Sequence, residues 1–145
     1  RSSTGYTRAM LNVVIEKASR QGYRPDASVV PDEAGVGRPA PFMCYRNAIE
    51  LQVFPLSACV KIGDTPSDIA EGRSAGMWTI AIARTGNEVG LSEAEWNGLS
   101  QMDQNNALAK ARSKLSAADF VVDSVANCDE ALDRIENGRS QTQCR

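Results

Sequence analysis

The chain has 145 residues, of which 42% are hydrophobic and 23% are charged, a balance typical of one globular domain with a buried core. A formal net charge of −2 without a basic stripe argues against a nucleic-acid partner, and the absence of histidine excludes Ser-His and Cys-His nucleophiles. No apolar run is long enough to span a membrane and no signal-peptide pattern opens the chain, so we expect a cytoplasmic protein without membrane contact.

The first predicted helix extends from Tyr6 to Gly22, because apolar residues recur there at helical spacing and the glycine ends the pattern. Ser3, Thr4 and Gly5 precede it, so hydroxyls and backbone N–H groups lie where the helix dipole favours a bound anion such as phosphate. The alternative is that Thr4 or Ser3 only caps the helix.

A short apolar run over Ala27–Val30 predicts a strand, and a polar loop follows it. The next helix is expected over Phe42–Gln52, since prolines bar a helix before Pro41 and apolar residues then recur on one face. Arg38 lies on the loop that enters this helix. A cation at such a place can neutralise a phosphoryl group, and the alternative is a solvated loop arginine.

A buried strand is predicted over Ala58–Ile62, a helix over Ile69–Ala75 and a second strand over Met77–Ala83. Two strands joined by a helix imply parallel pairing, and therefore an α/β fold. Beyond them we expect three helices, an edge strand, a linker within the domain and a disordered tail: the helices over Leu91–Leu99, Ala107–Leu115 and Cys128–Ile135, the strand over Phe120–Val122, the linker over Ser100–Asn106 and the tail over Gly138–Arg145.

The segment Gly-Asp-Thr-Pro-Ser-Asp, residues 63–68, follows the first of these strands. Ligands bind beyond the carboxyl ends of parallel strands, where Asp64 stands, and Mg²⁺ is commonly held by one or two carboxylates while water and phosphate complete its shell. We therefore predict a metal site at Asp64 and Asp68. The alternative needs no metal, because Thr65 as N-cap, Pro66 at the first helical position and Asp68 two residues later make a good helix start.

The cysteines are widely spread and lack metal-ligand spacing, so reduced thiols are expected rather than disulfides or a zinc site. They are Cys44, Cys59, Cys128 and Cys144, and the first two are expected in the core.

Three short motifs follow one another: Ser-Thr-Gly before a helix, Gly-Arg-Pro before a helix, and Gly-Asp-Thr-x-Ser-Asp after a strand. This order resembles the haloacid dehalogenase (HAD) superfamily, whose Rossmann-like core transfers phosphoryl groups through an aspartate nucleophile and Mg²⁺. Within it, the stretches SSTGYTR, GRPAPFMCYRNAIEL, KIGDTPSDIAEGRSAGMWT and VGLSEAEW resemble the phosphonatase (phosphonoacetaldehyde hydrolase) family. The resemblance implies that residues 1–137 are the C-terminal portion of a HAD-like core, with a parallel sheet flanked by helices.

Residue by residue, the resemblance implies that Thr4 and the Gly5 amide bind the phosphoryl group and that Arg38 neutralises it. Asp64 would be an Mg²⁺ ligand, and Asp68 would support the metal site, directly or through water.

The implied reaction cleaves the carbon–phosphorus bond of phosphonoacetaldehyde to acetaldehyde and phosphate, with Tyr6 lining the substrate cleft. In that family a lysine on a helical cap forms a Schiff base with the aldehyde, and an aspartate takes the phosphoryl group. The sequence contains no Asp-x-x-Gly-Thr motif, we expect it to lack the first strand of the sheet and the cap, and none of its lysines is assigned. We expect the 145 residues to be inactive by themselves and the full-length protein to be a homodimer.

Two alternatives remain open. A HAD-type phosphatase or mutase acting on C–O–P esters such as phosphoglycolate would share Thr4, Arg38, Asp64 and Asp68. A truncated, non-catalytic protein that binds phosphate is the other, and the missing nucleophile favours it. A lysine on the cap would separate the phosphonatase from the ester phosphatase.

Overall fold

The structure, a computed structural model, describes residues 2–142, with side chains for residues 2–138. Its contacts group into two compact units. The first comprises the residues up to Cys59 together with Ala70–Met77, and the second comprises Val60–Ile69 and the residues from Trp78 onward. In the described part of the chain, no helix combines the length and the apolar content that a membrane crossing requires.

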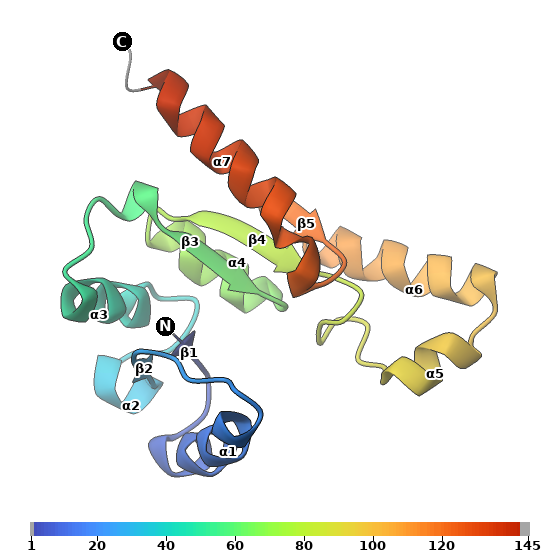
Figure 1. Cartoon of the computed structure of the whole chain (residues 1–145), viewed down its shortest axis with the longest axis horizontal. Helices are drawn as coiled ribbons and strands as arrows, with labels where there is room; N and C mark the ends of the chain where they lie inside the picture. The colour runs from blue at the N-terminus through green and yellow to red at the C-terminus, as the bar shows by residue number, and fades with distance from the viewer. Residues whose placement is uncertain (1, 143–145) are drawn as a thin grey trace. The chain divides into compact units, whose positions relative to one another are not determined.

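The first unit contains a parallel pair of short strands with helices around it (Figure 1). The predicted helices over Tyr6–Gly22 and Phe42–Gln52 are confirmed with slightly shorter bounds, and so is the strand predicted over Ala27–Val30. The elements of this unit are β1 (Ser2–Ser3), α1 (Arg8–Arg20), β2 (Ser28–Val29), α2 (Pro31–Ala34), α3 (Phe42–Leu51), the 3-10 turn η1 (Leu56–Ala58) and the end of α4.

The sequence pattern does not predict two short elements of this unit, β1 and α2. Strand β1 has two residues, too few to show the alternation that marks a strand. Helix α2 lies where a polar loop was predicted, so that prediction is wrong. Pro31 presets the backbone at the first helical position, and the Glu33 carboxylate accepts a hydrogen bond from Val30 N at 3.4 Å, which stabilises a single turn.

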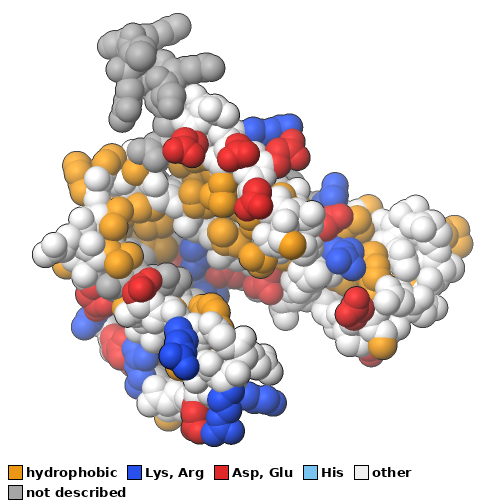
Figure 2. All heavy atoms as spheres, in the orientation of Figure 1, with side chains coloured by type: hydrophobic (Ala, Val, Ile, Leu, Met, Phe, Trp, Pro, Cys, Tyr) orange, Lys and Arg blue, Asp and Glu red, His pale blue; other side chains and the backbone are white. Residues whose placement is uncertain are grey.

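The core of the first unit is small. Met10 and Val14 on α1 remain 53% and 47% exposed, because little of the described chain packs against them. Figure 2 shows many apolar side chains open at the surface. The apolar residues buried in this unit are Leu11, Val29, Val30, Met43, Cys44 and Ala75.

The second unit is built on a three-stranded sheet in the order β3–β4–β5, with all strands parallel (Figure 1). The strands are β3 (Val60–Gly63), β4 (Trp78–Ile82) and β5 (Phe120–Val122), and α4 (Pro66–Ser74) connects the first two. The predicted strand–helix–strand unit with parallel pairing is confirmed, and β5 is an edge strand as expected.

Helices cover both faces of this sheet. Ala81 and Ala83 pack with Ala111 and Leu115 from α6 (Gln101–Lys114) and the residue after it. The alternate residues of β4, Ile80 and Ile82, face the other way and pack against α7 (Cys128–Thr142). Since successive side chains of a strand point to opposite faces, the two clusters lie on opposite sides of the sheet, as the predicted α/β fold requires.

Three helices follow β4, and two of them depart from the prediction. Helix α5 (Glu93–Gly98) is confirmed, but the predicted linker Ser100–Asn106 is wrong, because α6 begins at Gln101. The Ser100 side chain accepts a hydrogen bond from Asp103 N and caps α6.

The predicted disordered tail begins inside α7, which continues through Gly138 to Thr142; residues 143–145 lie outside the described residues. An established helix extends without a new nucleation cost, which lets it pass through a glycine.

Among the described residues, Cys44, Cys59 and Cys128 form no disulfide. Burial raises the pKa of the Cys128 thiol. Cys59 is only partly buried, contrary to prediction, because it lies in the connection between η1 and β3. Cys144 lies outside the described residues.

Candidate functional site

The loop between β1 and α1 carries Thr4, Gly5 and Tyr6 just beyond the carboxyl end of β1. Thr4 N donates to the carbonyl of Val29 in β2 at 3.4 Å, and Thr4 Oγ1 accepts from Tyr6 N at 3.3 Å. The Tyr6 side chain is 44% exposed. The hydroxyl of Thr4 is therefore fixed by its own loop, at the strand end where ligands of parallel sheets bind.

Helix α1 is capped by Thr7, whose side chain accepts a hydrogen bond from Met10 N. The alternative that Thr4 or Ser3 only caps this helix is therefore wrong.

Arg38 lies on the loop between α2 and α3, with its side chain 19% exposed. Its Nη2 donates to the carbonyl of Ser3 at 2.7 Å, so the Gly-Arg-Pro loop contacts the loop that carries Thr4. Its Nε lies 3.3 Å from Glu71 Oε2. The alternative of a solvated loop arginine is wrong, and two of the three predicted motifs meet.

Glu71 is a site residue that the sequence reasoning missed. It is fully buried on α4, and its Oε2 also accepts a weak hydrogen bond from Ser3 Oγ at 3.5 Å. A carboxylate three residues after Asp68, directly preceded by Ile69 and Ala70, could have signalled a buried acid on the same helix face. Glu71 holds Arg38 in place and neutralises part of the guanidinium charge.

Asp64 stands at the carboxyl end of β3 and is partly buried. Its Oδ2 accepts a hydrogen bond from Asn87 N at 3.0 Å. Its Oδ1 accepts none from the residues that the structure describes. One carboxylate oxygen of Asp64 is thus fixed by backbone, and the other is available to a ligand.

Asp68 is buried, and its carboxylate has different hydrogen-bond partners from that of Asp64. Its Oδ2 accepts hydrogen bonds from Thr65 Oγ1 at 2.6 Å and Thr65 N at 3.2 Å, while Asp68 N donates to Thr65 Oγ1. Its Oδ1 lies 3.6 Å from Lys61 Nζ, and the two side chains are 5% and 10% exposed. Thr65 and Asp68 therefore form the helix start that the alternative describes, and the Lys61 ammonium beside Asp68 Oδ1 disfavours a metal on that oxygen.

Three observations test whether these residues suit Mg²⁺. The donor chemistry fits, since Asp64 presents a hard carboxylate oxygen at a strand end. A Cβ on Gly63 would lie 2.3 Å from Asp68 Cβ, so this glycine lets the two acidic residues share one tight strand-to-helix connection. Among the described residues, no group of three or more His, Cys, Asp or Glu gathers for a metal. These residues therefore fit an ion that takes one or two protein carboxylates here and its other ligands from elsewhere.

The predicted residues fall into one group in each unit. In the first unit, Arg38 lies against the loop that carries Thr4, Gly5 and Tyr6. In the second, Asp64 and Asp68 share the connection between β3 and α4.

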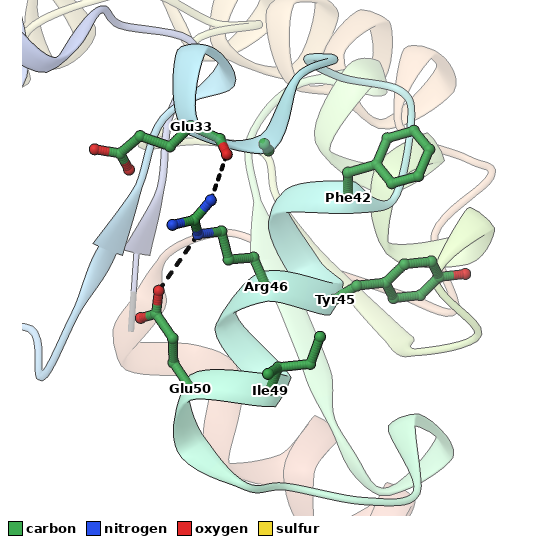
Figure 3. Close-up of a pocket in the computed structure, with 7 residues that line it drawn as sticks. Glu33, Phe42, Tyr45, Arg46, Ile49 and Glu50 are labelled. Atoms are coloured by element: carbon green, nitrogen blue, oxygen red, sulfur yellow. Dashed lines mark hydrogen bonds and ion pairs between the residues drawn. The ribbon is translucent and has the colours of Figure 1, made fainter.

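A pocket of about 580 Å³ in the first unit contains none of these residues (Figure 3). Phe42, Tyr45 and Ile49 from α3 line it, and Arg46 donates to the carbonyl of Glu33 and pairs with Glu50. Because its cation is already paired with a carboxylate and its wall is largely apolar, this pocket does not suit phosphate.

Comparison with known proteins assigns a family. The model of the HAD-hydrolase-like family matches residues 35–128, which include Arg38, Asp64 and Asp68. A phosphonoacetaldehyde hydrolase from Syntrophobacter fumaroxidans is 49% identical over 142 residues, covering 97% of this chain and 51% of that protein. Another from Bacillus thuringiensis is 42% identical over 137 residues, covering 93% and 52%. The chain thus spans about half the length of the curated relatives it matches.

The fold comparison agrees. The crystal structure of a phosphonoacetaldehyde hydrolase-like protein from Oleispira antarctica superposes with a TM-score of 0.88 at 36% identity, covering 93% of this chain and 50% of that one.

Proposed function

The chain belongs to the HAD-hydrolase-like family, and from this premise we propose that the full-length protein is a phosphonoacetaldehyde hydrolase. The proposed reaction is hydrolysis of the carbon–phosphorus bond to give acetaldehyde and phosphate. The observation that carries the proposal is the match to relatives of that name at 42–49% identity over 93–97% of the chain.

The first unit would supply phosphoryl recognition. Thr4 Oγ1 and the Gly5 amide stand at the end of β1, and Arg38 lies against the same loop. A fixed guanidinium stabilises negative charge on a transferring phosphoryl group without having to reorganise. Tyr6, exposed next to Gly5, would contact the organic part of the substrate.

The second unit would supply the metal ligand. Asp64 would bind Mg²⁺ through Oδ1, and the bound ion would neutralise charge on the phosphoryl oxygens. Asp68 would act indirectly, because its carboxylate already accepts a hydrogen bond from Thr65 and pairs with the ammonium of Lys61. It would keep the start of α4 in the geometry that places Asp64.

The nucleophilic aspartate and the Schiff-base lysine are assigned to the part of the full-length protein outside these 145 residues. Lys61 is a poor candidate for that lysine, since its side chain is 10% exposed and its ammonium is paired with Asp68. A side chain buried to this extent is not accessible to the aldehyde of a substrate.

The proposal is tested with the full-length protein and phosphonoacetaldehyde. We expect Mg²⁺-dependent release of phosphate and acetaldehyde in equal amounts, and inactivation by borohydride in the presence of substrate. Asp64→Ala should abolish the Mg²⁺-dependent turnover. Phosphate release from C–O–P esters without borohydride inactivation would instead identify an ester phosphatase.

We further propose a homodimer and a cytoplasmic location for the full-length protein. Light scattering coupled to gel filtration and cell fractionation test these two points separately.

A further inference from the structure

Residues 83–90, the loop that follows β4, contact Asp64, the proposed metal ligand. Its Asn87 N donates to Asp64 Oδ2 at 3.0 Å, across 23 positions of the chain. Among the described residues, the backbone amide of Asn87 donates its hydrogen bond to Asp64. The donor is a backbone amide, so no side-chain motif in the sequence predicts this contact.

Gly86 allows this contact. It is buried, and a Cβ built on it would lie 2.8 Å from Asp64 Cβ and 2.3 Å from the carbonyl oxygen of Ile82. Both distances are shorter than real side chains tolerate, so any other residue would push the loop away from Asp64. A buried glycine is needed here for a close approach of backbone to a functional side chain.

The loop is anchored on both sides of Asn87. Thr85 N donates to the carbonyl of Asp123 at 3.0 Å, and Gly90 N donates to the carbonyl of Gly86 at 3.1 Å. Glu88 pairs with Lys114 of α6 at 2.6 Å, with the Glu88 side chain 12% exposed. Val89 packs against the cluster of Ala81, Ala83, Ala111 and Leu115. These anchors hold the Asn87 amide at a fixed point.

We propose that the residue 83–90 loop positions Asp64 for the metal: the Asn87 amide holds Oδ2, Oδ1 is directed to Mg²⁺, and Gly86 is the positioning residue that makes this possible. A hydrogen bond from N–H to a ligating carboxylate fixes its rotamer and so lowers the cost of ordering it on binding. The proposal rests on the proposed function, in that it takes Asp64 as the Mg²⁺ ligand.

The test compares Gly86→Ala with Gly98→Ala in the full-length protein. Gly98 is in the same unit, and a Cβ there meets nothing within 4 Å, so it is a matched control. Mg²⁺ binding is measured by isothermal titration calorimetry without substrate, together with the Mg²⁺-dependent rise in Tm. We expect Gly86→Ala to weaken Mg²⁺ binding by about 10- to 100-fold, as loss of a group that orients a metal ligand does, and Gly98→Ala to leave it unchanged.

A second variant covers the case in which Gly86→Ala does not fold. Asn87→Pro removes the amide hydrogen at an exposed position and is expected to weaken Mg²⁺ binding by a similar factor while circular dichroism stays native. A Kd within twofold of the wild type in a folded Gly86→Ala or Asn87→Pro variant overturns the proposal.

Asp64→Ala in the same titration separates the two levels of inference. If Asp64→Ala binds Mg²⁺ as the wild type does, the metal assignment in the proposed function fails, and the positioning role fails with it. If Asp64→Ala loses binding and the loop variants keep it, only the positioning role fails.

Discussion

At the scale of single residues, each of the two groups of candidate site residues contains a buried ion pair. Arg38 pairs with the fully buried Glu71, and Lys61 pairs with the buried Asp68. Removing one member of a buried pair costs about 3–5 kcal/mol, because the other charge stays desolvated. A change at these positions therefore affects stability as well as chemistry, and the two must be measured separately.

Arg38→Ala is expected to lower turnover of the full-length enzyme by about 10²–10³, the usual effect of removing one electrostatic donor. It should also lower the Tm, since the carboxylate of Glu71 loses the Arg38 charge. Turnover is measured well below the Tm of the variant, so that unfolding does not contribute. Arg20→Ala is the control, because Arg20 belongs to a surface pair and is 76% exposed. A change of less than threefold in turnover would rule out phosphoryl neutralisation by Arg38.

At the scale of elements, one ion pair joins three segments of the first unit. Arg8 of α1 donates to both carboxylate oxygens of Glu33 in α2, at 2.8 and 2.6 Å, and also to the side chain and carbonyl of Ser28 in β2. The hydrogen bond from Arg8 is the main cause that holds the pKa of Glu33 below its usual range. A bidentate arginine fixes geometry better than a single contact does.

Glu33→Gln should therefore lower the Tm at neutral pH, and the difference from wild type should depend on pH. Because the folded-state pKa of Glu33 is depressed, its stabilisation is present above the unfolded pKa of about 4.3 and is lost as the pH falls through the lower folded value. Thermal melts of the full-length protein from pH 7 to pH 3 check this. Glu16→Gln, which breaks an exposed pair with Arg20, is the control. A Tm difference that stays constant down to pH 3 would contradict the prediction.

The elements that were not predicted from the sequence lack a periodic apolar face. Helices and strands with a periodic apolar face were predicted, such as α3 and β4. The start of α6 is entirely polar apart from Met102, so it shows no period, and only its Ser100 cap marks it as helical. Strand β1 has two residues, and its pairing with β2 depends on a contact rather than on a pattern.

At the scale of the whole chain, much apolar surface is open. Phe54, Ile49 and Val13 are 90%, 75% and 72% exposed, and β3 pairs with β4 alone among the described strands. The chain spans about half the length of its relatives. Exposed apolar groups and an open strand edge both favour association with other chains.

We therefore expect the isolated 145 residues to fold poorly, to bind the dye ANS and to aggregate at micromolar concentration, whereas the full-length protein does not. Gel filtration with light scattering and thermal melting measure this. A cooperative melt of a monomer without dye binding would contradict it.

The sequence by itself determined the local features: where α1, α3, β3 and β4 lie, and which residues are candidates for binding phosphate and a metal, because these depend on periodicity, caps and short motifs. Only the tertiary structure decided that Arg38 contacts Ser3 and Glu71 and that the loop at Gly86 holds Asp64. Those contacts join residues 23 to 35 positions apart, and they form only where the packing of whole elements offsets the entropy of closing such loops. A backbone amide such as that of Asn87 is also present in every residue but proline, so its partner is set by the fold and not by its side chain.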